Sequence, residues 1–301
     1  MSKAITFSEY GAPEVLRLSE VTAPEPGPGQ VRIRVRAASV NPLDMKIRSG
    51  LMAGTVPARF PVTPGLDAAG VVDAAGEGAD AAVGDEVLGS AVGGAYSEYA
   101  LLDRPVTKPA ALSWEVAASL VTVGRTAFRV LGQLGVQAGQ TLLVHGAGGS
   151  VGTIAVQLAV ARGITVIGTA GEHDIERVTA LGATAVRYGD GWAERVRAAA
   201  PRGVDFVFDA SGAGVLADSV VLTGDSAHVI TIADMSAAQH GVRFSAGGDD
   251  QDGESLPELV RLAAAGRLTL PIGRTYPLAE AARAHTDLEA RHHHGKAVLL
   301  P

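Results

Sequence analysis

The sequence predicts an α/β protein in two parts, a compact β-barrel or sandwich followed by a parallel sheet with helices on both faces. Three observations support this prediction. The chain has 301 residues, which suggests about two domains. Residues 1–111 read as short strands separated by turns. From residue 112 onward, buried strands alternate with helices, which is typical of a doubly wound sheet.

The strands of the first part are indicated by period-two alternation. Residues 30–40 alternate apolar and polar side chains, and residues 64–103 repeat a strand, a glycine-rich turn and a strand. Pro24, Pro26 and Pro28 predict an extended connection, because proline does not fit inside a sheet. No helix is required inside this part.

The second part begins where the period becomes helical, with Ser113 as a predicted helix N-cap. Strands are then predicted at 141–146, 164–170, 184–188, 204–211 and 228–234, and helices at 150–163, 173–182 and 192–200. The β-branched strand runs favour a parallel sheet that is buried on both faces. The chain ends in a helix and a strand, and we expect the last strand to return to the first part. The predicted domains are therefore 1–111 together with 271–301, and 112–270.

The composition excludes several classes of function. The chain has no cysteine, so disulfides, cysteine-ligated zinc, iron–sulfur clusters and a thiolate nucleophile are ruled out. Its net charge of −7 argues against nucleic acid or an anionic membrane as a partner. The N-terminus lacks the pattern of a secretory signal, and no apolar run reaches the ~18 residues of a membrane span. We therefore expect a cytoplasmic protein with a small-molecule partner.

The strongest functional signal is a glycine-rich turn between a predicted strand and a predicted helix. Its glycines stand at 146, 149 and 152. Such a turn lets backbone N–H groups approach a pyrophosphate, and the helix that follows offers the positive end of its dipole. A glycine pattern alone is a weak signal, but its place in a βαβ series predicts dinucleotide binding.

The end of the next predicted strand bears on which dinucleotide is bound. The carboxylate that would bind the ribose of NAD is missing there, although Glu172 follows closely. Gly171 leaves space for the phosphate of NADP, and Arg177, Arg187 and Tyr188 are candidate partners for it. These residues favour NADPH, and NADH stays open as the alternative.

Signals for other chemistry are weak. His292, His293 and His294 are consecutive and cannot jointly hold one ion, and residues 249–254 lack the ligand spacing of a calcium loop, so both read as solvated loops. Hydrolase and phosphotransfer motifs are missing from the sequence. With a hydride donor and no metal, the acceptor must already be electrophilic, as a quinone or a carbonyl conjugated to C=C is.

Eight segments in a fixed order carry a family resemblance: ASVNPLDMKIRSG (38–50), TPGLDAAGVV (63–72), GDEV (84–87), GGAYSEYA (93–100), AASLVTVGRTAFRVL (117–131), VHGAGGSVGTIAVQLA (144–159), VDFVFDASG (204–212) and GKAVL (295–299). They resemble the zinc-independent quinone oxidoreductases, the zeta-crystallin-like branch of the medium-chain dehydrogenase/reductases. The zinc-containing branch has a histidine where this sequence has Leu66, which again predicts no zinc. The resemblance implies a GroES-like β-barrel catalytic domain and a Rossmann domain.

The resemblance also implies roles for single residues. The implied catalytic residues are Asn41 and Asp44, beside the nicotinamide, and Lys46, which could donate a proton to an enolate. The implied cofactor-binding residues are Asn41, Thr126, Gly146, Ala147, Gly148, Gly149, Ser150, Val151, Gly152, Gly171, Tyr188, Ser211, Phe244 and Ser245. From the residues alone, Asn41 is equally well a turn residue before Pro42, and Asp44 a helix N-cap.

Two positions depart from the family pattern. The loop after Gly171 contains three acidic residues and no lysine that could bind a phosphate. Lys46 stands where some quinone-reducing relatives have tyrosine, and where enone-reducing relatives often have lysine. Relatives often dimerise by joining their sheets edge to edge, so a homodimer is expected, with residues 228–234 as the candidate edge strand.

The expected function is therefore NADPH-dependent hydride transfer to quinones or α,β-unsaturated carbonyls without a metal. Two alternatives stay open, because no residue is an unmistakable acid or base. One is an enoyl reductase of a biosynthetic pathway. The other is a cofactor-binding sensor or structural protein with little turnover.

Overall fold

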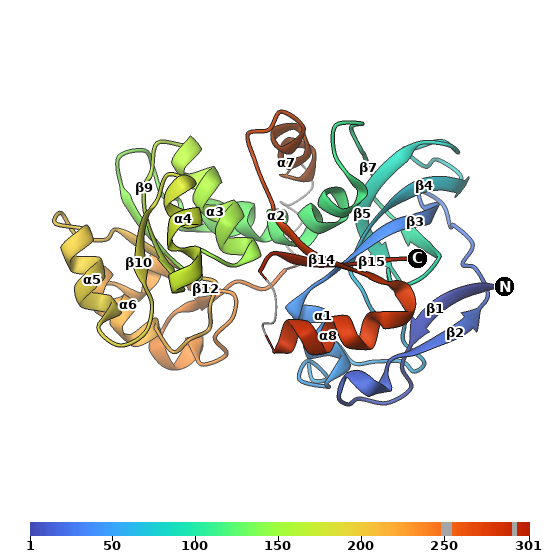
Figure 1. The fold of residues 1–301 in the computed structure, drawn as a ribbon, viewed down its shortest axis with the longest axis horizontal. Helices are drawn as coiled ribbons and strands as arrows, with labels where there is room; N and C mark the ends of the chain where they lie inside the picture. Colours follow the sequence, from blue (N-terminus) through green and yellow to red (C-terminus); the bar gives the residue numbers. More distant parts are fainter. Residues whose placement is uncertain (248–254, 291–293) are drawn as a thin grey trace. The chain divides into compact units, whose positions relative to one another are not determined.

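The computed structural model describes residues 1–247, 255–290 and 294–301 (Figure 1). The contacts within the chain define two compact units. The first unit is Met1–Thr122 with Leu256–Pro301, and the second unit is Val123–Ser255. The predicted domains, 1–111 with 271–301 and 112–270, stay a prediction, because dense contacts within a unit do not show that the unit folds on its own. Residues 249–254, His292 and His293 lie outside the described residues.

The first unit is built on a barrel. Its strands are β1 (Ser2–Thr6), β2 (Arg17–Val21), β3 (Val31–Val40), β4 (Asp67–Ala75), β5 (Glu86–Val92), β6 (Tyr99–Leu102), β7 (Val106–Thr107), β14 (Ile272–Pro277) and β15 (Lys296–Leu300). Strand β3 pairs with β4 and with β6, and β5 pairs with both of these, so the four strands close on themselves. Closure of these four strands confirms the predicted β-barrel.

The C-terminal strand returns to the first unit, as predicted. Strand β15 pairs antiparallel with β3, and Ala297 lies opposite Val40. This pairing brings Lys296 next to the end of β3, where Asn41 follows. Helix α8 (Ala281–Glu289) packs on the same core through Ala281 and Ala284, both of which are fully buried.

The expectation of no helix in the first part was wrong. Helix α1 (Pro42–Arg48) starts directly after β3, with Asn41 as its N-cap. Asp44, at the third helical position, accepts the backbone N–H of Asn41 at 2.8 Å, so the N-cap lies three residues before the position considered for it. The sequence also allowed Asn41 to be a turn residue before Pro42, but proline is favoured in the first turn of a helix as well.

The second unit contains a parallel sheet of six strands in the order β10-β9-β8-β11-β12-β13. The strands are β8 (Thr141–His145), β9 (Thr165–Ala170), β10 (Thr184–Arg187), β11 (Phe206–Asp209), β12 (Val229–Thr231) and β13 (Arg243–Phe244). Among the described residues, the α-helices other than α1 and α8 are α2 (Trp114–Leu134), α3 (Ser150–Ala161), α4 (Ile175–Ala180), α5 (Trp192–Ala199), α6 (Leu216–Thr223) and α7 (Ser255–Ala264). Ser113 accepts the N–H of Val116 at 3.3 Å and caps α2, as predicted.

Both faces of the parallel sheet are buried, which confirms the doubly wound arrangement. On one face, Leu143 and Val207 pack with Val196 of α5 and Leu216 of α6. Their neighbours along the strands point to the other face and are buried as well, Leu142 and Val144 among them. Apolar side chains on both faces explain why the strand runs are continuous rather than alternating.

The predicted edge strand was wrong. Strand β12, inside the predicted range 228–234, pairs with β11 on one side and with β13 on the other. The edge on this side of the sheet is therefore β13, which has two residues, Arg243 and Phe244. A strand this short contains no apolar alternation, so the sequence carries no signal for it.

Candidate functional site

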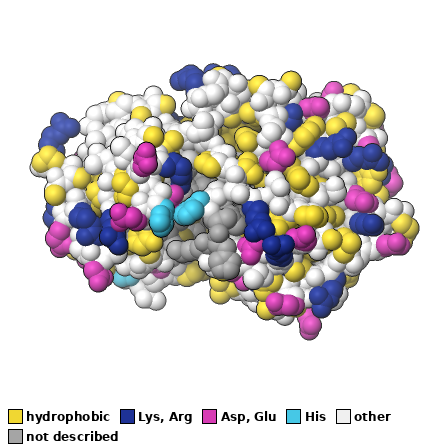
Figure 2. All heavy atoms as spheres, viewed as in Figure 1, with side chains coloured by type: hydrophobic (Ala, Val, Ile, Leu, Met, Phe, Trp, Pro, Cys, Tyr) yellow, Lys and Arg dark blue, Asp and Glu magenta, His cyan; other side chains and the backbone are white. Residues whose placement is uncertain are grey.

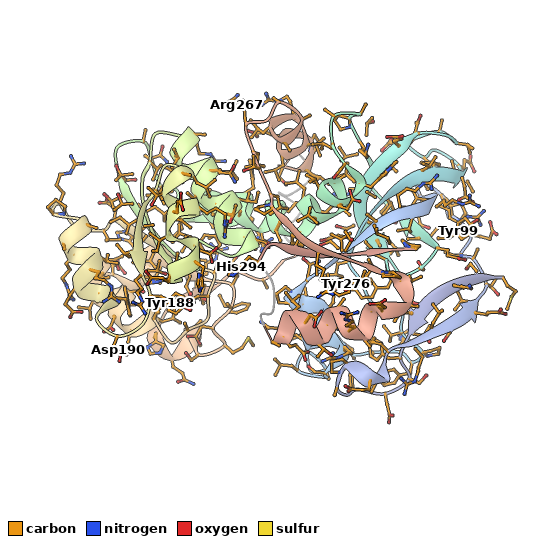
Figure 3. The ribbon with its side chains drawn as sticks, in the orientation of Figure 1. Tyr99, Tyr188, Asp190, Arg267, Tyr276 and His294 are labelled. Carbon is orange, nitrogen blue, oxygen red and sulfur yellow. The ribbon has the colours of Figure 1, made fainter. Side chains whose placement is uncertain are left out.

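The predicted cofactor residues of the second unit follow the ends of its strands. The turn 146–152 follows β8, Gly171 follows β9, Tyr188 follows β10 and Ser211 follows β11 by two residues. Figure 3 labels Tyr188 on this unit. Because the strand pairings are parallel, the carboxyl ends of the strands meet at one edge of the sheet. Residues that are far apart in the sequence are thus gathered along a single edge.

Two glycines of the glycine-rich turn have different roles, one in helix packing and one in leaving space for a ligand. A Cβ at Gly152 would lie 2.2 Å from the carbonyl oxygen of Gly146, so the helix packs on the turn only because Gly152 has no side chain. Gly149 is the N-cap of α3, and among the described residues a Cβ there would meet a single atom within 4 Å, the Gly146 oxygen at 3.3 Å. Apart from this one oxygen, the space in front of Gly149 is open, next to helix N–H groups that the helix itself cannot satisfy. An anionic pyrophosphate fits such a place.

Arg177 holds this turn from outside. Its guanidinium donates to the carbonyl oxygen of Gly148 and, at 3.0 Å, to the hydroxyl of Thr153. It also pairs with Asp174 at 2.7 Å. A Cβ at Gly148 would lie 2.5 Å from the Asp174 carboxylate, so that carboxylate packs directly on the turn. Arg177 was a candidate phosphate partner, but both terminal nitrogens of its guanidinium already donate to groups of the protein.

Four of the residues considered for the choice between NADPH and NADH form two contacts. Arg187 pairs with Glu172 at 3.2 Å, and both side chains are about two-thirds exposed, at 68% and 69%. The ring of Tyr188 lies against Gly171, because a Cβ there would be 3.2 Å from the Tyr188 Cε1. Arg195 donates to the carbonyl oxygens of residues 187–189 and fixes the backbone that carries both side chains.

Ser211 lies next to the turn. A Cβ at Gly146 would be 3.3 Å from the Cβ of Ser211. The Ser211 hydroxyl donates to Asp209 at 2.7 Å, and the backbone N–H of Ser211 donates to the same carboxylate oxygen at 2.9 Å. Asp209 is fully buried and receives the Thr231 hydroxyl as well, so this carboxylate shapes the loop after β11.

Among the remaining predicted contacts of the second unit, Ser245 is held by Arg129. Its Nε donates to the hydroxyl of Ser245 at 3.1 Å. Thr126 lies three residues before Arg129 on helix α2, and therefore on the same side of that helix. Phe244, the residue before Ser245, is 37% exposed.

In the first unit, Asn41 joins a buried lysine to a buried carboxylate. Lys296 donates to the Asn41 Oδ1 at 2.7 Å, and the Asn41 Nδ2 donates to the Asp67 Oδ2 at 2.9 Å. The Asp67 Oδ1 accepts the Thr122 hydroxyl at 2.6 Å. Lys296 and Asp67 are 3% and 0% exposed. The neutral amide of Asn41 therefore bridges two buried ionisable side chains by hydrogen bonds.

A second chain of buried groups runs through Asp44. The Tyr96 hydroxyl lies 3.0 Å from the Asp44 Oδ2 and 3.2 Å from the His285 Nε2. The other ring nitrogen of His285 lies 3.4 Å from Arg48, which pairs with Glu289 at 2.7 Å. Asp44, Tyr96, His285 and Arg48 are each at most 2% exposed. The Asp44 Oδ1 has no hydrogen-bond partner among the described residues.

Asp44 also lines a cavity of about 370 Å³ inside the first unit. Most of its lining is apolar and comes from segments 47–66 and 91–94, with Leu66 and Arg59 among the residues. Lys46, the third predicted catalytic residue, is half-buried on α1 and is not part of this lining. Asn41 is buried and is used by Lys296 and Asp67, so of the three predicted catalytic residues Asp44 is the one that reaches the cavity.

Burial shifts the protonation of both clusters. Burial, and next to it the charge of Asp67, raises the pKa of Asp44 to about 7, against the hydrogen bonds from Asn41 and Tyr96. Burial lowers the pKa of Lys296 to about 8, while the nearby carboxylates act in the opposite direction. Burial and the positive charge of Arg48 lower the pKa of His285 to about 3, so the imidazole is neutral. Asp44 is thus poised to give or take a proton near neutral pH.

Leu66 occupies the position at which the zinc-containing branch has a histidine. Leu66 lines the cavity, and the carboxylate of Asp67 faces Asn41 and Thr122. Within residues 1–247, 255–290 and 294–301, no group of three or more His, Cys, Asp or Glu side chains could hold a metal ion. Independence from metal stays a prediction for the reaction itself.

The sequence motifs contained several residues of these clusters without indicating their roles. Asp67, Tyr96 and Lys296 stand in quoted motifs, and His285 stands in none. Their contacts join β4, β15 and α8, which are far apart in the sequence. Helical spacing between Asn41, Asp44 and Arg48 is the one local signal that could have brought this group to attention.

A barrel unit with a titratable carboxyl at a cavity, and a parallel-sheet unit with a dinucleotide-type turn, together define a medium-chain dehydrogenase/reductase. Family models agree: the alcohol dehydrogenase GroES-like domain matches residues 27–112, and the zinc-binding dehydrogenase model matches residues 181–299.

Individual relatives narrow the class. A quinone oxidoreductase of Lama guanicoe is 36% identical over 100% of this chain and 98% of its own length. One of Pseudomonas aeruginosa is 33% identical over the full length of both chains. The solved structure of the Escherichia coli quinone oxidoreductase complexed with NADPH is 28% identical, with a TM-score of 0.89, over 99% of this chain and 100% of that one. The chain belongs to the quinone oxidoreductase family, which confirms the family predicted from the motifs.

Proposed function

We propose that this protein is an NADPH-dependent oxidoreductase that reduces quinones or α,β-unsaturated carbonyls by direct hydride transfer without a metal. Membership of the quinone oxidoreductase family supports the class of enzyme, and the NADPH in the related Escherichia coli structure supports the cofactor. The alternatives of a biosynthetic enoyl reductase and of a protein with little turnover are not favoured by these relatives.

The observation that carries the proposal is the open space in front of Gly149. Backbone N–H groups at the start of α3 would hold the pyrophosphate there, and Arg177 keeps the turn in shape. Gly171, Arg187 and Tyr188 would accept the adenosine phosphate, while Thr126, Ser211, Phe244 and Ser245 stay the predicted contacts of the nicotinamide side. A bound NADPH supplies the hydride.

The cavity of the first unit would hold the acceptor. Its apolar lining suits the ring or chain of a conjugated carbonyl compound. Negative charge develops on the substrate oxygen as hydride adds, and that oxygen then needs a proton. Asp44 is the proposed donor, and Asn41 would keep its place in the cluster by bridging Lys296 and Asp67. Lys46 stays a predicted alternative donor.

An acceptor assay tests the proposal. Purified protein is mixed with NADPH and either phenanthrenequinone, an aliphatic vinyl ketone or an enoyl thioester, and the loss of NADPH absorbance is followed. We expect oxidation with the first two and unchanged rates after treatment with a chelator. Oxidation only with the thioester would support the enoyl reductase, and cofactor binding without oxidation would support a sensor or structural protein.

We further propose a cytoplasmic homodimer with small-molecule ligands as its partners. In the described part of the chain, no helix combines the length and apolar character needed to cross a membrane. On the face drawn in Figure 2, basic and acidic side chains lie interspersed, which gives no support to nucleic acid as a partner. Light scattering of the purified protein measures the oligomeric state, and a monomer would contradict the homodimer.

A further inference from the structure

We propose that Tyr96 and His285 are positioning residues that place the acidic proton of Asp44 on Oδ1, the carboxyl oxygen that has no hydrogen-bond partner among the described residues. The inference rests on the proposed function, in which Asp44 protonates the reduced substrate. It adds two residues that neither the motifs nor the relatives' names assign to the reaction.

The direction of the hydrogen bonds follows from Arg48. A guanidinium can only donate, so the His285 Nδ1, 3.4 Å from the Arg48 Nη1, must accept. The neutral imidazole then carries its hydrogen on Nε2 and donates it to the Tyr96 oxygen, 3.2 Å away. The Tyr96 hydroxyl is therefore left to donate to the Asp44 Oδ2 at 3.0 Å.

This direction decides which oxygen of Asp44 is protonated. Oδ2 already accepts two hydrogens, one from Tyr96 and one from the Asn41 backbone. Oδ1 has no partner among the described residues. A proton on Oδ2 would displace one of the donors, whereas a proton on Oδ1 displaces nothing. The protonated carboxyl thus presents an O–H donor from its unused oxygen.

The proton transfer is balanced with the groups at hand. The O–H bond at the Asp44 Oδ1 breaks, and a new O–H bond forms on the enolate or hydroquinone oxygen. The carboxylate that remains is stabilised on Oδ2 by Tyr96 and the Asn41 N–H, and a proton from the solvent restores the carboxyl group. Among the charged groups around Asp44, Lys296 favours its ionised form and Asp67 opposes it, and Arg59 stands in the cavity lining.

Infrared spectroscopy of the cofactor-free protein tests the hydrogen bonds directly. The carbonyl band of protonated Asp44 is identified as the band missing from Asp44→Asn, and its loss is followed with pH. The Tyr96 hydroxyl lowers the pKa of Asp44, so Tyr96→Phe should move the midpoint upward by about one pH unit. An unchanged midpoint overturns the inference.

Tyr276→Phe is the matched control. Tyr276, labelled in Figure 3, is as deeply buried as Tyr96 and donates its hydroxyl to the carboxylate of Asp287 at 2.9 Å. Both substitutions remove one buried hydroxyl from the same core. If Tyr276→Phe moves the Asp44 midpoint as far as Tyr96→Phe does, the effect is a general loosening of the core and the inference fails.

His285 is tested by loss and rescue. His285→Leu removes the donor to Tyr96 and should shift the Asp44 midpoint upward, whereas His285→Gln retains an N–H donor and should leave the midpoint near that of wild type. Equal shifts in both variants contradict the positioning role. Tyr96→Phe should also move the alkaline limb of the pH profile of kcat/KM upward. If the wild-type protein fails to oxidise NADPH with every acceptor tested, the proposed function fails. The infrared midpoints still decide where the proton of Asp44 is placed.

Discussion

The two units assemble their candidate functional groups in different ways. In the second unit the backbone forms the site: a strand ends, three glycines follow, and a helix begins within a dozen residues. In the first unit the site is a network of side chains, and the bond between Lys296 and Asn41 joins positions 255 residues apart. The backbone site can therefore be predicted from a short stretch of sequence, while the side-chain network of the first unit forms only after the barrel has closed.

Removing Lys296 should have the largest effect and should fall on the first unit. Lys296→Met leaves Asp67 buried without its nearby cation, and breaking a buried pair in this way costs about 3–5 kcal/mol. Urea unfolding monitored by circular dichroism measures the loss. Lys108→Met is the control, because Lys108 is also buried but its partner Glu86 is 47% exposed and can turn to water. A similar loss in both variants would contradict the cost assigned to Asp67.

The glycine turn should respond in two separable ways. Gly149→Val places methyl groups in the open space at the start of α3, so NADPH affinity should fall at least 100-fold, or about 2.7 kcal/mol, while the melting temperature stays close to that of wild type. Gly152→Ala forces a Cβ into the Gly146 carbonyl oxygen and should lower stability instead. Isothermal titration and thermal unfolding distinguish them. Unchanged affinity in Gly149→Val would remove the turn from the cofactor site.

These differences explain what could be predicted from the sequence. Period-two alternation predicted the strands of the first unit, and the alternation of strands with helices predicted the parallel sheet, because each strand run is set by burial on one or two faces. The turn at 146–152 was found because its function depends on adjacent residues. Helix α1 was missed because it is short and begins with Pro42, and β13 was missed because two residues show no period.

Within the candidate site, the sequence indicated side chains but not their partners. Asp44 was predicted through the family resemblance, and the pairing with Tyr96 and His285 could not be, since those residues lie 52 and 241 positions away. Arg177 reads as a phosphate partner in a list of basic residues, yet both terminal nitrogens of its guanidinium already donate to Gly148, Thr153 or Asp174. Local spacing cannot show whether a charged group is already satisfied.

Asp44→Asn should stabilise the protein while it removes the proposed proton donor. Burial raises the pKa of Asp44 from 3.8 to about 7, so the folded protein holds a proton that the unfolded chain loses between these values. The free energy of unfolding therefore falls as the pH rises through this window and stays low above it. Asparagine does not ionise, so the variant should be the more stable protein above pH 7, and the gap should close towards pH 4.

The expected gain at pH 8 is on the order of 2 kcal/mol, about half of the roughly 4 kcal/mol that three pKa units represent, because the new amide brings hydrogens into the cluster. His285 and His145 titrate in an overlapping window with the opposite slope, but both proteins contain them, so the difference isolates Asp44. Urea unfolding at pH 5 and pH 8 measures it. A wild type that is more stable at pH 8 would show that Asp44 is ionised without strain.

The smallest effect should come from the exposed edge of the second unit, where a side chain rather than the backbone is expected to choose the cofactor. Arg187→Glu replaces the cation beside Tyr188 with a second acid next to Glu172. NADPH affinity should fall about tenfold, or 1.4 kcal/mol, and NADH affinity should stay level, since solvent screens this site. Arg197→Glu is the control, because Arg197 is exposed in the same unit and pairs with Glu194 at 3.7 Å. Titrations of both variants with both cofactors measure the effect. An equal loss for NADPH and NADH would place the role of Arg187 in the loop structure and not in phosphate recognition.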